Sequence, residues 1–222
     1  MREFREIEAI AAKRKGGPKA LERLLDTPLP TAKLARVPAS TWLEAMAKAL
    51  FQAGFNWSVI DSKWPAFKAA FEGFDVRLVS HYGDADIDRL LADNSIVRNG
   101  AKIAAVIDNA RLLSRLGDET GGASRHLANW PVEDHRGLLA LLADKGARLG
   151  GVTGQWVCRM VGRDGYILSP DVCKRLTEEG VIDGAPTSKR AMTAVQDAFN
   201  WWRSESGRPL TQISQILAMS VD

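Results

Sequence analysis

A helical spacing of apolar residues, sustained from about Ala39 onward, is the feature that most constrains the fold of this chain. Leu43, Met46 and Leu50 recur at intervals of three and four residues, which places their side chains on one face of a helix. The same spacing returns in several later segments, whereas strand-like alternation of apolar and polar residues is absent from the first half of the chain. The sequence therefore predicts an almost entirely helical protein.

The helix through Leu50 is expected to end at a corner that carries two aromatic residues. Gly54 suits the left-handed turn that ends a helix, and Phe55 and Trp57 follow it closely. Two interpretations of these rings stay open. Aromatic residues just past a helix end commonly pack in a core, but they can also form the wall of a pocket for a flat ligand.

Length and composition limit the class of protein. The 222 residues are enough for one sizeable globular unit or for two lobes that share a cleft. Cys158 and Cys173 form neither a CxxC pair nor a disulfide framework, which suits a reduced cytosol. The N-terminus lacks an apolar signal core, and no run approaches the roughly 20 apolar residues of a membrane span. We therefore expect a soluble, cytoplasmic protein with no membrane partner.

A glycine-rich turn between two apolar helices marks the second half of the chain. Leu149-Gly150-Gly151-Val152-Thr153-Gly154 separates a helical pattern from a second one that carries Trp156 and Val157. Glycines let a backbone approach a phosphate, and amide N–H groups at a helix start supply partial positive charge for it. This predicts a hairpin over about residues 136–163. The residues expected to bind phosphate are Gly150, Gly151, Val152, Thr153 and Gly154.

Two motifs resemble those of DNA-3-methyladenine glycosylase type I, a member of the helix-hairpin-helix DNA glycosylase superfamily. The family's QAGLSW is similar to Gln52-Ala53-Gly54-Phe55-Asn56-Trp57. Its IIRxxxKI…NA is similar to Ile96-Val97-Arg98-Asn99-Gly100-Ala101-Lys102-Ile103 followed by Asn109-Ala110. The resemblance covers roughly residues 40–222, and the glycine-rich turn resembles the hairpin of the superfamily.

The resemblance implies an all-α, two-lobed fold with a central cleft, preceded by an N-terminal helical arm. The expected division is an arm over residues 1–38 and a glycosylase-like domain over residues 39–222. The implied activity is that of a monofunctional DNA glycosylase in base excision repair, which flips alkylated, 3-methyladenine-like purines out of duplex DNA and hydrolyses their N-glycosidic bond. Such enzymes need no cofactor. The implied partner is double-stranded DNA with a damaged base, bound by a monomer.

The resemblance also assigns roles to residues. Trp57 matches the tryptophan on which the flipped base stacks, and Phe51 and Gln52 are expected to bind the base with it. Phe55 matches the apolar residue that fills the gap left in the duplex. Further possible DNA contacts are Arg98, Asn99 and Lys102.

A catalytic carboxylate is expected after the hairpin. Residues 165–176 resemble the superfamily segment VDxxVxR, whose aspartate faces the sugar of the flipped nucleotide. With Val172 in register, Ser169 stands at the usual aspartate position and Asp171 follows two residues later. We assign Asp171 as the catalytic residue, although it could instead be the N-cap of the following helix.

Several departures from the family bear on activity. Ala49 stands where type I members carry a glutamate that hydrogen-bonds the damaged adenine. Gln155 stands where the lyase members of the superfamily carry a nucleophilic lysine, so no lyase activity is expected. The histidines show no ligand spacing with the cysteines, and no metal site is expected. A different class therefore stays open: a catalytically weak or inactive DNA-binding relative that recognises lesions or distorted duplex.

Overall fold

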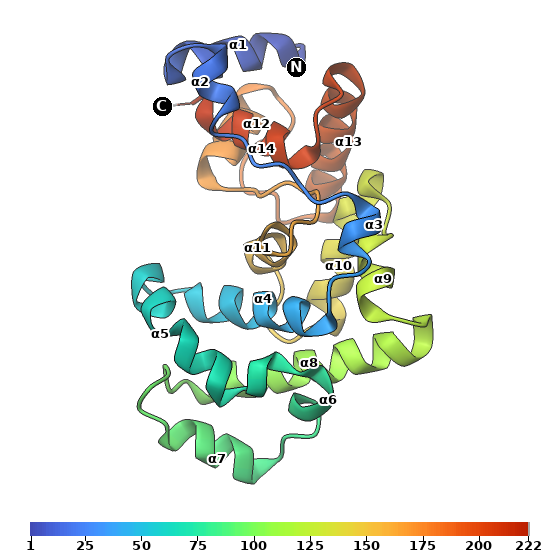
Figure 1. The fold of residues 1–222 in the computed structure, drawn as a ribbon. Coiled ribbons are helices and arrows are strands. Elements are labelled where there is room, and N and C mark those ends of the chain that lie inside the picture. Colours follow the sequence, from blue (N-terminus) through green and yellow to red (C-terminus); the bar gives the residue numbers. More distant parts are fainter. Residues whose placement is uncertain (222) are drawn as a thin grey trace. The chain divides into compact units, whose positions relative to one another are not determined.

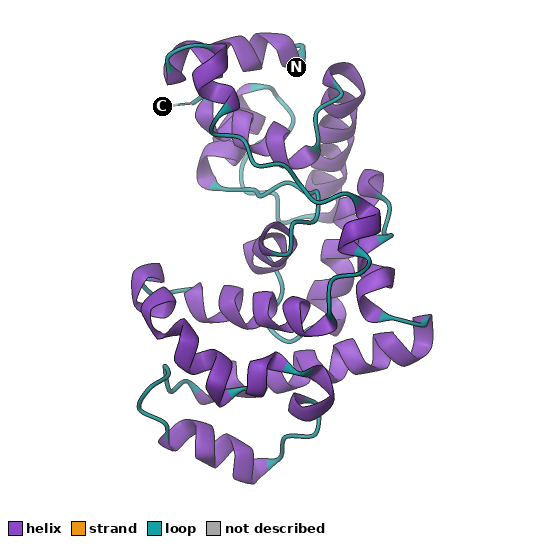
Figure 2. Cartoon of the chain, in the orientation of Figure 1, coloured by secondary structure: helices purple, strands orange, loops and turns teal. Residues whose placement is uncertain are grey.

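The computed structural model describes residues 1–221, and within that range its secondary structure consists of helices and loops without a strand (Figure 2). The predicted all-α class is confirmed. Two compact units are built from segments that alternate along the chain (Figure 1). The first unit contains Met1–Leu29, Pro131–Leu138 and the residues from Gly162 onward, and the second contains Pro30–Trp130 and Leu139–Val161. The predicted boundary after residue 38 and the predicted central cleft stay predictions.

Helix α4 (Ala39–Gln52) is the centre of the second unit. Its predicted apolar stripe faces the core, because Leu43 and Met46 are fully buried and Leu50 is nearly so. Burial of each such side chain contributes about 1.5–3 kcal/mol. The helices packed against α4 are α5 (Trp57–Ala70), α8 (Gly100–Thr120) and α11 (Val152–Met160). The unit also contains α3 (Thr31–Leu34), η1 (Glu72–Phe74), α6 (Val76–Val79), α7 (Asp84–Ala92) and α9 (Ala123–Ala128).

The predicted pair of helices around the glycine-rich turn is present. Helix α10 (His135–Lys145) ends before the turn and α11 starts after it. The fully buried Asn109 of α8 anchors the turn through both ends of its amide: Nδ2 donates to the Ala147 carbonyl at 3.1 Å, and Oδ1 accepts from the Ala147 N–H at 2.8 Å. These two bonds tie the turn to the longest helix of the unit.

The first unit has its own core. Aromatic rings of Phe4, Phe199 and Trp202 are fully buried there, and the Trp202 ring contacts the other two. Helix α1 (Phe4–Lys15) packs on α13 (Lys189–Ser206) and α14 (Leu210–Met219), and α12 (Pro170–Glu178) packs on α14. The unit also contains α2 (Pro18–Glu22) and η2 (Val132–Asp134). The N-terminal helix is therefore part of a packed core.

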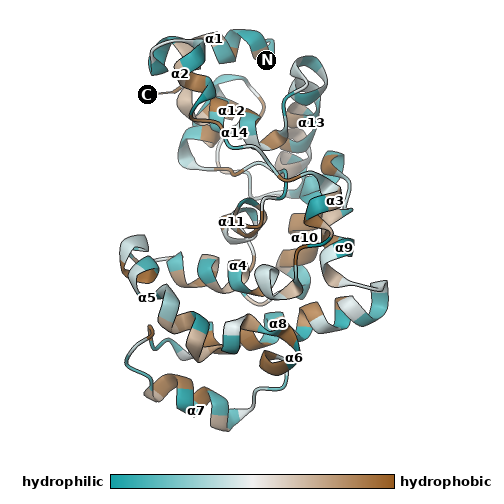
Figure 3. Cartoon of the chain, in the orientation of Figure 1, coloured by the Kyte–Doolittle hydropathy of each residue, from teal (hydrophilic) through white to brown (hydrophobic). Residues whose placement is uncertain are grey.

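Hydropathy along the helices agrees with this burial. Figure 3 shows polar and apolar residues interspersed along the ribbons of α4 and α8, as expected for helices with one buried face. Among the helices of residues 1–221, none combines the length and apolar character that a bilayer crossing requires.

Candidate functional site

The corner between α4 and α5 exposes two aromatic rings. Gly54 adopts a φ of 76°, the left-handed conformation that glycine tolerates best, and lets the chain turn directly after α4. Asn56 caps α5, because its side chain accepts a hydrogen bond from the Ser58 N–H at 3.0 Å. Phe55 is 41% exposed and Trp57 is 43% exposed. The interpretation of these rings as core residues is therefore wrong for both.

Lys102 holds the corner in place. Its Nζ donates to the carbonyl oxygen of Ala53 at 2.7 Å and lies 3.5 Å from that of Phe51, which satisfies carbonyl groups at the end of α4. The same ammonium lies 4.5 Å from the centre of the Phe55 ring. Burial, and secondarily the positive charge of Arg148, lower the pKa of Lys102. The cation is thus used to fix an exposed aromatic side chain.

The three residues predicted as possible DNA contacts differ in their surroundings. The Asn99 side chain caps α8 by accepting a hydrogen bond from the Lys102 N–H at 3.1 Å. Arg98 is exposed. DNA contact by these residues stays a prediction, and two of them have a structural role besides.

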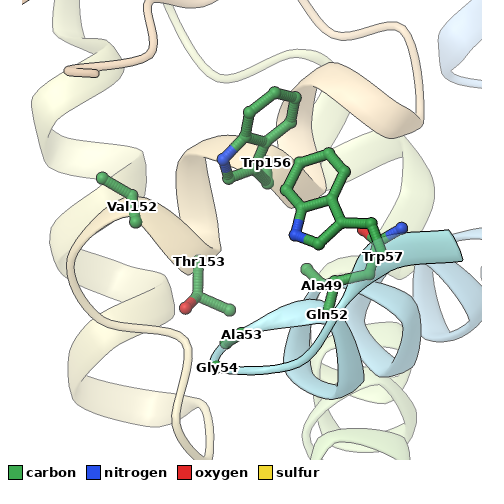
Figure 4. A pocket seen from close by; sticks show the side chains of 8 residues that line it. All are labelled: Ala49, Gln52, Ala53, Gly54, Trp57, Val152, Thr153 and Trp156. Carbon is green, nitrogen blue, oxygen red and sulfur yellow. The ribbon is translucent and has the colours of Figure 1, made fainter. Parts of the chain in front are cut away.

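A hollow of about 210 Å³ lies beside Trp57. Figure 4 shows the indole of Trp57 next to that of Trp156, which comes from α11. The two ring centres are 5.0 Å apart, and the rings meet edge to face at 84°. The hollow is lined by Ala49, Gln52, Ala53, Gly54, Trp57, Val152, Thr153 and Trp156. Side chains from the α4 corner and from the first two turns of α11 therefore share one apolar pocket.

Of the two further residues predicted to bind a base, one lines the pocket. Gln52 is 4% exposed and belongs to the lining. Phe51 is fully buried, and its ring packs against Phe67 with centres 4.5 Å apart. A ring enclosed in this way cannot stack on a base, so Phe51 supports the pocket from the core and is left out of the binding set.

The glycine turn has the geometry of a close backbone approach. Gly151 precedes α11 with a φ of 60°, and Val152 is 47% exposed. Gly154 is buried, and a Cβ there would lie 2.6 Å from the carbonyl oxygen of Leu149. The N-cap of α11 is Gly151, and no side chain caps the N–H groups of the first turn of this helix. Phosphate binding at this turn stays a prediction.

The predicted carboxylate lies at the start of α12. Ser169, and not Asp171, is the N-cap, because its hydroxyl accepts a hydrogen bond from the Val172 N–H at 3.3 Å. The N-cap interpretation of Asp171 is therefore wrong: Pro170 occupies the first helical position, and Asp171 follows as an exposed residue of the first turn. Its catalytic role stays a prediction.

Trp156 is the pocket residue that sequence reasoning missed. Its position on α11 fits an apolar helical face, so the sequence indicated packing alone. Because it is half-buried and meets Trp57 edge to face, it forms a second aromatic wall. Gln155, beside it, is 5% exposed. Within residues 1–221, no group of three or more His, Cys, Asp and Glu side chains is arranged to hold a metal ion.

The chain is similar to known proteins in sequence and in structure. Residues 37–138 match the family model described as methyladenine glycosylase. Over 60 residues the chain is 38% identical to DNA-3-methyladenine glycosylase 1 of Escherichia coli (strain K12) and 30% identical to DNA-3-methyladenine glycosylase of Haemophilus influenzae (strain ATCC 51907 / DSM 11121 / KW20 / Rd). Each match spans 27% of this chain and 32% of the relative, so the chain matches about a third of the length of these relatives.

Solved structures agree on the fold. The 3-methyladenine DNA glycosylase I of Staphylococcus aureus, in a study of 3-methyladenine recognition, is 20% identical with a TM-score of 0.51 over 70% of this chain and 90% of that one. The Methanocaldococcus jannaschii 8-oxoguanine glycosylase/lyase, in complex with a 15mer DNA containing 8-oxoguanine, is 12% identical with a TM-score of 0.56 over 96% of this chain and 95% of that one. At these identities, the likeness concerns the fold.

We predict that Gly154→Ala destabilises the second unit, because the added Cβ meets a backbone oxygen that cannot move aside. The loss should be about 1–2 kcal/mol, since overpacking outweighs the gain in helix propensity. Gly150→Ala is the matched control: its Cβ would find only the Cβ of Ala143, at 3.9 Å. Urea unfolding of both variants measures the difference. Equal stability of the two variants would contradict the close approach.

Proposed function

We propose that the protein is a monofunctional DNA glycosylase, because residues 37–138 match the methyladenine glycosylase family model. It would hydrolyse the N-glycosidic bond of alkylated, 3-methyladenine-like purines in duplex DNA. The observation that carries the proposal is that the indole of Trp57 is exposed beside the hollow of about 210 Å³. The relatives named for DNA-3-methyladenine glycosylase activity support the substrate class.

Base flipping follows from the position of the reacting bond. An enzyme cannot reach the glycosidic bond of a stacked base, so it must extrude the nucleotide at a cost of a few kcal/mol. Trp57 and Trp156 supply indole surface on which an extruded base can stack. Because an N3-alkylated adenine is cationic, an electron-rich indole attracts it more strongly than it attracts an unmodified base. This favours damaged over normal purines.

Duplex binding is proposed to use the residues around this pocket. The uncapped N–H groups at the start of α11 suit a phosphate, and such contacts read no base sequence. Phe55, held in place by Lys102, has the exposure and bulk to fill the gap left in the base stack. Phosphate contacts release counterions, so duplex affinity should fall steeply as salt increases.

Chemistry is proposed to involve Asp171. As the base departs, the sugar develops oxocarbenium character, which a nearby carboxylate stabilises. Water adds to C1′ and loses a proton to solvent, while the electron pair of the broken bond passes to the cationic base, which leaves neutral. Because Ser169 caps α12, the carboxylate of Asp171 is not used as the N-cap, and Asp171 is exposed. No cofactor is required for this hydrolysis.

The inactive alternative has its own support. Ala49 contributes only a methyl group to the pocket, at the position where the family's glutamate hydrogen-bonds the base. A protein that stacks a base without this carboxylate could sense lesions and leave the bond intact. Both candidates bind duplex DNA, and only the enzyme releases free base.

We predict that the wild-type protein releases 3-methyladenine from methylated duplex DNA and that Trp57→Ala abolishes release while weak duplex affinity remains. Chromatography of liberated bases and salt-dependent binding measure the two properties. Trp201→Ala is the matched control, because that indole is 38% exposed but lies on α13, in the first unit. Binding without release by the wild type would favour the inactive alternative, and equal loss of both properties in Trp57→Ala would indicate a packing residue.

Asp171→Asn should lower the rate of base release by about ten- to a hundredfold with little change in duplex affinity. The decrease in rate should be largest for the base that leaves most slowly, because a base that leaves readily depends less on stabilisation of the sugar by a carboxylate. Single-turnover release of 3-methyladenine and 7-methylguanine measures it. Asp197→Asn, an exposed aspartate on α13, is the control. An unchanged rate in Asp171→Asn would remove this residue from the mechanism.

Each released base should leave an intact abasic site. Gln155 carries an amide and no nucleophilic amine, so no Schiff base with the sugar can form there. Borohydride treatment during turnover should therefore trap no protein–DNA adduct, and strands should break only after added alkali. A trapped adduct would show that another amine attacks the sugar.

A further inference from the structure

The pocket contains a buried acceptor without a donor. Gln52 ends α4, is 4% exposed and lines the hollow. Its Oε1 is buried and has no hydrogen-bond partner within the described residues 1–221. Buried amide oxygens are nearly always paired, because an unpaired one loses its hydration without compensation. A ligand that donates a hydrogen bond to this oxygen would remove that cost.

A neighbouring carboxylate fixes the orientation of the Gln52 amide. Nε2 of Gln52 donates to Oδ1 of Asp61 at 3.3 Å. An ionised carboxylate only accepts hydrogen bonds, so turning the amide around would set Oε1 against it. Figure 4 shows Gln52 among the side chains that line the hollow, behind Trp57.

Lys48 in turn holds the carboxylate. Its Nζ lies 2.8 Å from Oδ1 of Asp61, the same oxygen that accepts from Gln52. Lys48 and Gln52 are one turn apart on α4, and Asp61 is one turn beyond Trp57 on α5. The chain of contacts therefore joins the two helices that make the corner. None of the residues that line the hollow carries a charge. Among their side chains, that of Gln52 contains the most deeply buried hydrogen-bond acceptor.

We infer that Asp61, held by Lys48, is a positioning residue that fixes Gln52 as a hydrogen-bond acceptor, so that the pocket prefers bases presenting an N–H group over bases that lack one. The inference rests on the proposed function, since it takes the ligand to be a purine base. Recognition then uses a neutral oxygen oriented from outside the pocket, in place of a carboxylate within it.

The test uses free bases, so that it does not depend on catalysis. 3-Methyladenine and 3-methylpurine differ by the exocyclic amino group alone. Calorimetric titration of the wild-type protein should show about five- to tenfold tighter binding of 3-methyladenine, the value of one buried hydrogen bond. Asp61→Ala should bring this ratio close to one, because position 61 then offers no side-chain acceptor and the Gln52 amide can take either orientation. A residue with a merely structural role would weaken both bases equally and keep the ratio.

Two further variants keep the test decisive. Asp108→Ala is the matched control, because Asp108 is a similarly exposed helical aspartate paired with Arg111. It should keep the wild-type ratio. Gln52→Met retains approximate volume without an acceptor and should bring the ratio to one, with folding checked by thermal unfolding.

Three results would overturn the inference: a wild-type protein that binds neither base, an unchanged ratio in Asp61→Ala, or an unchanged ratio in Gln52→Met. Failure of the proposed function is distinguishable from these. It would appear as amino-selective binding of free bases without release of any base from methylated DNA.

Discussion

The corner of the second unit depends on how the last carbonyl groups of α4 are hydrogen-bonded. A helix leaves these carbonyl groups without partners in its own backbone, and here the ammonium of Lys102 donates to the carbonyl oxygens of Phe51 and Ala53. That contact lets the chain turn at Gly54 without a longer connecting segment, and it puts a cation under the Phe55 ring. Two aromatic side chains can then stay exposed on a rigid corner, where a ligand could meet them at little entropic cost.

A second constraint comes from the glycine turn. Because Gly154 lets the backbone of α11 approach Leu149, the first turns of that helix lie against α4. Val152 and Thr153, at the start of α11, also line the hollow beside Trp57. Stacking of a base and contact with a phosphate would therefore both depend on one helix, which couples the two steps of recognition without a conformational change.

The sequence predicts the periodic parts of this structure well, because helical spacing alone determines which face is buried, as for Leu43 and Met46. It cannot decide whether an aromatic residue near a helix end is covered, since that depends on other segments; Trp57 is exposed, whereas Phe51, in the last turn of α4, is enclosed. The pairing of Trp156 with Trp57 joins segments far apart in the chain, and no local pattern indicates it.

Because no carboxylate lines the pocket, selectivity for damaged over normal bases would have to come from other interactions. Attraction of a cationic base to an indole contributes about 0.5–2 kcal/mol, which amounts to roughly a two- to thirtyfold preference. A positive charge on the base also weakens the glycosidic bond, because the base can leave as a neutral molecule. Under the proposed function, if binding discriminates only modestly, reactivity must supply the remaining selectivity, and a normal base that enters the pocket would be spared because it leaves slowly. Ala49 is compatible with repair on this basis, because the damage itself lowers the barrier.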